Sequence, residues 1–137
     1  MQGIVLAFDF GLRRIGVAIG NALTRSARAL APIAARDGAP DWVALGRVLE
    51  EWKPSRLVVG LPLNMDDTPS AMSERASRFA RQLEGRFRVP CELVDERLSS
   101  FEARGLIAES GRKASTDSVA ACLILECWFA SRPAEQE

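Results

Sequence analysis

Acidic residues in unusual places are the first sign of chemistry in this sequence. Asp9 interrupts the otherwise apolar run of residues 4–10. Asp95 and Glu96 close a short apolar run, and Asp117 opens a strongly apolar segment. An unpaired carboxylate in a buried strand loses hydration energy, so it must be paired or neutralised. Brought together, such carboxylates form an all-oxygen cluster that suits Mg²⁺ or Mn²⁺, the ligand set of two-metal phosphodiester chemistry.

Each of these carboxylates also has a purely structural interpretation. Asp9 would pair with one of the two arginines that follow it, although this does not explain its place in an apolar strand. Asp117 would stabilise a helix start by facing the positive end of the helix dipole. Asp95 and Glu96 are neighbours that point to opposite sides of a continuing strand, so the residues alone leave open which of the two joins the cluster.

The composition excludes several other kinds of chemistry. The chain has no histidine, which excludes a serine–histidine or cysteine–histidine nucleophile and a histidine-bound zinc. Its 3 cysteines, an odd number without C-x-x-C spacing, argue against a disulfide framework and a thiolate metal site. The 18 basic and 18 acidic residues give no net charge, so any binding of nucleic acid must come from a local patch. Catalysis therefore falls mainly to carboxylates.

The length and the alternation of apolar patterns predict how the carboxylates are positioned. A chain of 137 residues, 47% of them apolar, suits a single domain over residues 1–137. Strands are expected at residues 4–10, 14–20, 27–34, 56–61 and 91–94, and helices at 42–52, 70–87, 100–108 and 117–130. Asp41 is expected to cap the first helix, and Pro32 indicates an edge position for the third strand.

This order of elements predicts an α/β fold. A three-stranded meander comes first, and helices then alternate with parallel strands, giving a mixed five-stranded sheet flanked by helices. In such sheets the working groups gather outside the carboxyl ends of the strands. Asp9 and the pair Asp95–Glu96 are both expected at such ends.

Four segments, occurring in one order along nearly the whole chain, resemble the YqgF/RuvX family. They are residues 8–18 (FDFGLRRIGVA), 60–66 (GLPLNMD), 95–103 (DERLSSFEA) and 113–126, which begins with Lys113. The resemblance implies a ribonuclease-H-like fold and a nuclease similar to Holliday junction resolvases and pre-16S rRNA nucleases. It also implies that Asp9, Glu96 and Asp117 form the catalytic acidic triad that holds Mg²⁺ or Mn²⁺. Asp67 departs from the family, which commonly has glycine there.

Basic and polar residues supply candidates for binding nucleic acid. The chain has 16 arginines and 2 lysines, and planar guanidinium groups suit bidentate phosphate contacts. The candidates are Arg13, Arg14, Arg97, Asn64 and Lys113. Asn64 could equally make a local turn. A further stripe on the second helix, Arg75, Arg78 and Arg81, reads more simply as a solvated face.

The leading functional hypothesis is a metal-dependent endonuclease that processes the 5′ end of pre-16S rRNA, with branched DNA as a second candidate substrate. One rival is a non-catalytic RNA-binding module of the same fold. Another is an actin/hexokinase-like ATP-handling domain, suggested by the D-x-G turn but disfavoured by the short chain. No apolar stretch approaches the ~20 residues that span a membrane, so we expect a cytoplasmic protein, monomeric or homodimeric, with nucleic acid as its partner.

Overall fold

The structure, a computed structural model, describes residues 3–62, 70–95 and 116–130. Its strands are β1 (Ile4–Asp9), β2 (Arg14–Asn21), β3 (Ser26–Arg36), β4 (Ala39–Pro40), β5 (Arg56–Leu61) and β6 (Cys91–Asp95). Its helices are α1 (Trp42–Trp52), α2 (Ala71–Phe87) and α4 (Thr116–Ala130). The helix expected at residues 100–108 lies outside the described residues.

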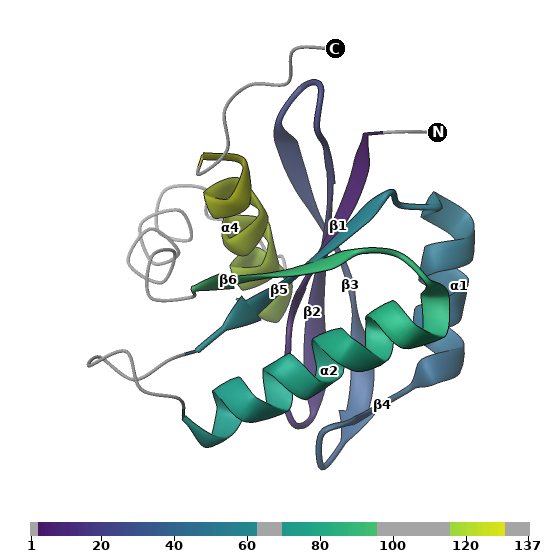
Figure 1. Cartoon of the computed structure of the whole chain (residues 1–137), viewed down its shortest axis with the longest axis vertical. Coiled ribbons are helices and arrows are strands. Elements are labelled where there is room, and N and C mark those ends of the chain that lie inside the picture. The colour runs from purple at the N-terminus through teal and green to yellow at the C-terminus, as the bar shows by residue number, and fades with distance from the viewer. Residues whose placement is uncertain (1–2, 63–69, 96–115, 131–137) are drawn as a thin grey trace.

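The strands form a mixed sheet in the order β4-β3-β2-β1-β5-β6 (Figure 1). β1 pairs antiparallel with β2, and β2 pairs antiparallel with β3. On its other side β1 pairs parallel with β5, which pairs parallel with β6. The predicted meander followed by parallel strands is therefore confirmed. β1, β5 and β6 end on the same side of the sheet, which we call the carboxyl edge.

The sheet has one strand more than the sequence predicts. The short β4 pairs with the end of β3, with Arg36 opposite Ala39. The two residues between them, Asp37 and Gly38, have φ angles of 51° and 85°. A two-residue turn with both angles positive is the favoured hairpin connection, and Asp-Gly is its common sequence. This dipeptide was the available signal for the extra strand.

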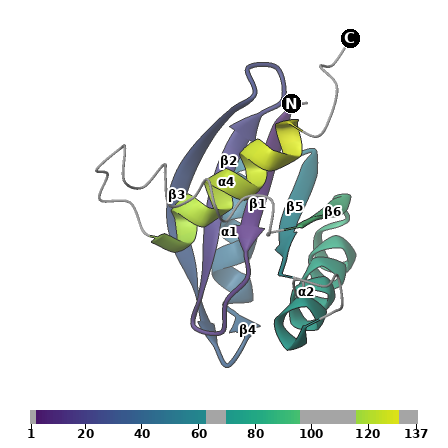
Figure 2. The same cartoon turned by 90° about the vertical axis from the view of Figure 1, so that its left-hand side faces the viewer.

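Helices cover both faces of the sheet (Figure 2). α1 and α2 pack on one face around a core that includes Phe8, Leu45 and Phe79. The predicted cap of α1 is confirmed, because the Asp41 side chain accepts a hydrogen bond from the backbone N–H of Ala44. Ser70 caps α2 in the same way and completes a capping box. No helix in the described ranges is long and apolar enough to cross a membrane.

Among the described helices, α4 is the one that packs on the opposite face, and most of its described side chains are buried there. It contributes Ala121, Ile124 and Leu125 to a second core that includes Ala7 of β1. Close approach depends on Gly20 of β2, where an added Cβ would lie 2.6 Å from Leu125 Cδ2. The strongly apolar character of this helix, which predicted its burial, thus agrees with its packing against the sheet.

Candidate active site

Asp9 is the last residue of the central strand β1 and lies at the carboxyl edge. Successive side chains of a strand point to opposite faces. Val5 and Ala7 pack in the core beneath α4, so Asp9 belongs to the α4 face, whereas Phe8 packs beneath α1 and α2. The carboxylate is half-buried. A charged group is thus placed where the apolar interior ends, as the sequence predicted.

Asp95 ends β6 at the same edge but belongs to the other face. It pairs with Leu61 of β5, and only β5 separates β6 from β1. Its neighbour Val94 packs in the core beneath α4. Alternation therefore places Asp95 on the face of α1 and α2, opposite to Asp9. Asp95 and Asp9 are therefore separated by the sheet. Glu96 lies outside the described residues, and its place beside Asp9 stays a prediction.

Ser118 fixes the start of α4 against the sheet. Its side chain is 1% exposed. Its hydroxyl donates a hydrogen bond of 2.6 Å to the carbonyl of Leu30 and accepts one of 3.4 Å from the N–H of Val17. The two strands shift register here, between Ile15 and Val17. The hydroxyl thus joins β2 and β3 at an irregular point of their ladder.

This anchor sets the position of Asp117, the residue before Ser118 in the first turn of α4. Val17 pairs with Phe8, and the next pair toward the edge is Gly16 with Asp9. The backbone of Asp117 therefore starts the helix near the level of Asp9, on the same face of the sheet. The sequence reasoning missed Ser118, although a hydroxyl at the start of a strongly apolar helix was the available signal.

Replacing Ser118 by alanine is expected to lower the free energy of unfolding by about 1–3 kcal/mol, because buried backbone groups of Val17 and Leu30 lose their partner. Denaturant unfolding measures this change. Ser55→Ala is the control, since the exposed Ser55 hydroxyl also donates to a carbonyl, that of Ile4 at 3.2 Å. This control is expected to change stability by less than about 0.5 kcal/mol. Equal effects of the two substitutions would show that Ser118 does not anchor α4.

The turn after Asp9 brings two arginines to the surface. Gly11 is required here, because an added Cβ would lie 2.3 Å from the backbone oxygen of Arg14. The carbonyl of Arg13 accepts a hydrogen bond of 2.8 Å from the N–H of Ala35, which ties the turn to β3. The side chains of Arg13 and Arg14 are exposed. The turn therefore presents positive charge beside the end of β1.

Several predicted site residues are not covered by the structure. Asn64, Glu96, Arg97 and Lys113 lie outside the described residues, as does Asp67. Asp117 is described as part of α4, without its side chain. Within the described ranges, no group of three cysteine or acidic side chains is placed to hold a metal ion. The predicted triad of Asp9, Glu96 and Asp117 therefore stays a prediction.

The cysteines are not part of this site. Cys122 is buried in the core beneath α4 and Cys127 packs against this core, whereas Cys91 lies at the start of β6, at the end of the strand opposite to Asp9. Burial, with smaller contributions from the charges of Glu84 and Glu92, raises the pKa of the Cys91 thiol to about 12. This thiol is therefore protonated at neutral pH and is a poor nucleophile.

Solved structures of junction-resolving enzymes share this fold. The chain is similar to the Thermus thermophilus RuvC in complex with a Holliday junction, with a TM-score of 0.57 and 15% identity, covering 93% of this chain and 94% of that one. It is also similar to the fowlpox virus Holliday junction resolvase, with a TM-score of 0.57 and 12% identity, covering 93% and 97%. These likenesses define a ribonuclease-H-like fold of the RuvC type.

Sequence comparison gives the family. Residues 3–131 match the family described as "RuvX: Holliday junction resolvase". A protein of Azotobacter vinelandii, named as a proposed pre-16S rRNA nuclease, is 52% identical over 136 residues, covering 96% of each chain. A protein of Chromohalobacter salexigens with the same name is 54% identical over 134 residues, covering 94% of this chain and 90% of that one. This chain belongs to the RuvX family, a family of nucleases, as the resemblance predicted.

Proposed function

We propose that this chain is a divalent-metal-dependent endonuclease that cuts the 5′ region of pre-16S rRNA. It would act in the cytoplasm as a single domain, monomeric or homodimeric. The observation that carries the proposal is the meeting of two elements on one face of the sheet. Asp9 ends the central strand there, and Ser118 fixes the start of α4 at nearly the same level. The names of the relatives supply the RNA substrate, and the family description makes branched DNA the second candidate.

The donors at this edge suit a hard divalent cation. Asp9 is a half-buried carboxylate at the end of an apolar strand, where a cation would offset the cost of burying its charge. Asp9, Glu96 and Asp117 would hold Mg²⁺ or Mn²⁺. Such ions, when bound, activate a water molecule and stabilise the leaving oxygen in phosphodiester cleavage.

The remaining predicted residues would position the nucleic acid. Arg13 and Arg14 are exposed on the turn after Asp9, where their guanidinium groups can bind phosphates next to the one that is cut. Arg97, Asn64 and Lys113 would add contacts around the same edge. The backbone hydrogen bond from Ala35 to Arg13 ties this turn to β3. The backbone that carries the two arginines is therefore held in a defined position relative to the sheet.

The structure explains the D-x-G turn, the motif that suggested an ATP-handling domain, without a bound phosphate. The glycine of the D-x-G turn is Gly11, and the close approach of the Arg14 carbonyl accounts for it without any phosphate. The non-catalytic RNA-binding module keeps the same surface and differs only in turnover. It is therefore the alternative that an experiment must separate from the nuclease.

The test is incubation of the purified protein with two labelled substrates, the 5′ segment of pre-16S rRNA and a four-way DNA junction. Each is combined with Mn²⁺, Mg²⁺ or chelator. We expect defined cleavage of the RNA with a metal ion and none with chelator. Binding of RNA without cleavage under any of these conditions would contradict the nuclease and favour the RNA-binding module. Cleavage of the junction alone would make branched DNA the substrate.

A further inference from the structure

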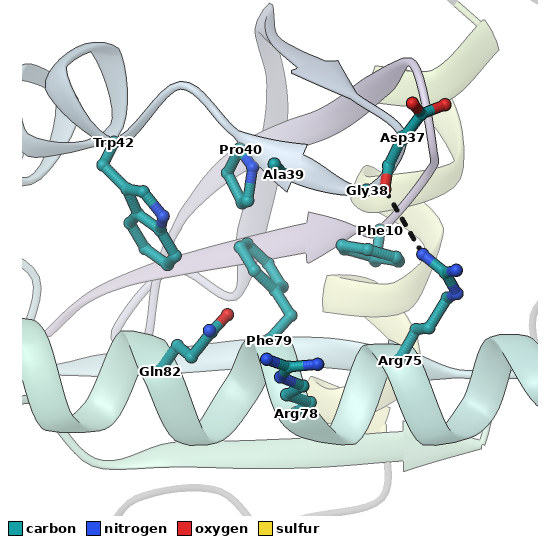
Figure 3. Close-up of a pocket in the computed structure, with 10 residues that line it drawn as sticks. All are labelled: Phe10, Asp37, Gly38, Ala39, Pro40, Trp42, Arg75, Arg78, Phe79 and Gln82. Carbon is teal, nitrogen blue, oxygen red and sulfur yellow. Dashed lines mark hydrogen bonds between the residues drawn. The ribbon is translucent and has the colours of Figure 1, made fainter.

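A pocket opens on the face of α1 and α2, beside the β3–β4 hairpin (Figure 3). Its volume is about 360 Å³, within the range of small-ligand pockets. The residues that line it come from the end of β1, the hairpin with β4, the start of α1, and α2. They are Phe10, Asp37, Gly38, Ala39, Pro40, Trp42, Arg75, Arg78, Phe79 and Gln82. We call it the aromatic–arginine pocket.

Aromatic rings form the inner wall of this pocket. The rings of Phe10 and Phe79 have centroids 5.2 Å apart, and those of Trp42 and Phe79 lie 6.0 Å apart. Figure 3 shows the three rings side by side between the β4 hairpin and α2. Trp42 is half-buried, and the Arg86 guanidinium lies 4.0 Å from the centre of its ring. Phe79 and Phe10 are buried, with 1% and 9% of their surface exposed, so a flat, apolar group would make its contact mainly with the half-buried Trp42.

Arginines form one side of the pocket. Arg75 and Arg78 are exposed and line it from α2, whereas Arg81 on the same helix does not. Spacing explains the division, because residues 75, 78, 79 and 82 share one face of a helix and residue 81 lies off that face. The predicted solvated stripe is therefore divided in the structure. Two of its arginines meet an aromatic wall and the third does not.

The acidic residue in the lining leaves the pocket positive. Arg75 Nη1 donates a hydrogen bond of 3.4 Å to the backbone carbonyl of Asp37, while the Asp37 carboxylate points away from the rings (Figure 3). Gly38 keeps the space open, since an added Cβ would lie 2.7 Å from Arg75 Nη1. Aromatic surface beside guanidinium groups is the combination that binds an unpaired base and its phosphate.

The pocket and the proposed active site lie on opposite faces of the sheet, both close to its carboxyl edge. Phe10 directly follows Asp9, and the two residues belong to opposite faces of the sheet. A single strand of nucleic acid that crosses the edge can therefore reach both places with neighbouring nucleotides. We propose that the aromatic–arginine pocket binds an unpaired nucleotide of the RNA strand next to the phosphate that is cut. This inference rests on the proposed function, which supplies the scissile phosphate.

The arginine test compares three charge-removing variants on one helix. Arg75→Gln and Arg78→Gln remove pocket arginines, and Arg81→Gln is the matched control. Anisotropy of a fluorescein-labelled, single-stranded 12-nucleotide RNA is measured in chelator, so that no cleavage occurs. We expect each pocket variant to bind about fivefold or more weakly, and the slope of log affinity against log salt to fall by about 0.7 per lost phosphate contact. Arg81→Gln is expected to leave the slope unchanged. Equal effects of all three variants on RNA binding would contradict the proposal that the pocket binds a nucleotide.

The aromatic test compares two tryptophans of α1. Trp42→Leu removes a pocket wall, while Trp52→Leu removes a half-buried tryptophan outside the pocket that also has an arginine near its ring, Arg28 at 5.8 Å. Stacking on one base predicts about tenfold weaker RNA binding for Trp42→Leu and no loss for Trp52→Leu. Thermal unfolding confirms that each variant is folded. Should Trp42→Leu fail to fold, a competition experiment with the wild-type protein replaces it. A dinucleotide is expected to displace the labelled RNA at a lower concentration than inorganic tripolyphosphate does. Equal displacement by the two competitors would contradict a pocket that binds a base.

Cleavage of the wild-type protein separates this inference from the proposed function. If the wild-type protein cleaves RNA with Mn²⁺ but the Arg78→Gln and Arg81→Gln variants bind RNA equally well, the pocket proposal fails and the nuclease proposal stands. If the protein never cleaves but the pocket variants alone lose RNA affinity, the nuclease fails and the pocket stands as a nucleotide site of an RNA-binding module.

Discussion

Asp9→Asn is expected to lower the rate of RNA cleavage by about a thousandfold or more, since a loss of several kcal/mol of transition-state stabilisation has this effect. The amide has nearly the shape of the carboxylate but lacks the charge that would hold the cations. Single-turnover cleavage with saturating Mn²⁺ measures the change. Because Asp9 is only half-buried at the end of its strand, the variant is expected to remain folded.

Asp41→Asn is the matched control for this prediction. It makes the same chemical change at an exposed aspartate that caps α1, and asparagine caps helices about as well as aspartate. Its cleavage rate and its melting temperature are expected to stay near those of the wild type. Full turnover by a folded Asp9→Asn variant would rule out a metal cluster built on the end of β1.

Glu96→Gln is expected to abolish cleavage and the stabilisation by Mn²⁺, whereas Asp95→Asn keeps both. The physical reason is the register of β6. Asp95 pairs with Leu61 and belongs to the face of α1 and α2, while Asp9 belongs to the face of α4. A ligand that binds only the native state stabilises it, by about 2.7 kcal/mol at a hundredfold excess over its Kd. Melting curves with and without Mn²⁺ therefore report the cluster independently of catalysis.

The opposite pattern has a definite meaning. Loss of both properties in Asp95→Asn, with Glu96→Gln unaffected, would show that the chain turns at the end of β6 and that Asp95 is the ligand. If Mn²⁺ stabilises neither the wild type nor the variants, the metal cluster does not form. The RNA-binding module then becomes the better account of this surface.

Much of the fold follows from local sequence patterns. The strand β5 and the helix α1 have the predicted bounds, and α2 differs only in beginning one residue later, because Ser70 is its cap. Continuous apolar runs predicted buried strands, and helical spacing predicted the helices. The missed strand β4 is only two residues long, and its Asp-Gly turn is a weaker signal than periodicity.

The candidate site was predictable only in part. The sequence by itself determined that Asp9 closes a buried strand and that Asp117 opens a buried helix, because both facts are local. The assignment of Glu96 and Asp117 to one cluster with Asp9 came from the family resemblance and stays a prediction. Four separated motifs together predicted the family and the ribonuclease-H-like class. The family match and the similar solved structures confirm both.

Packing between distant segments decided the rest. Only the paired sheet shows that Asp9 and Asp95 belong to opposite faces, since alternation gives relative faces within one strand and none between strands. Only the docking of α4 places Ser118 on the ladder of β2 and β3, 88 residues from Leu30. The pocket likewise depends on the packing of the β4 hairpin against α2, where Arg75 donates a hydrogen bond to the carbonyl of Asp37. The pattern of apolar residues along the sequence predicts which side chains are buried. Which side chains they contact depends on how the helices pack on the sheet.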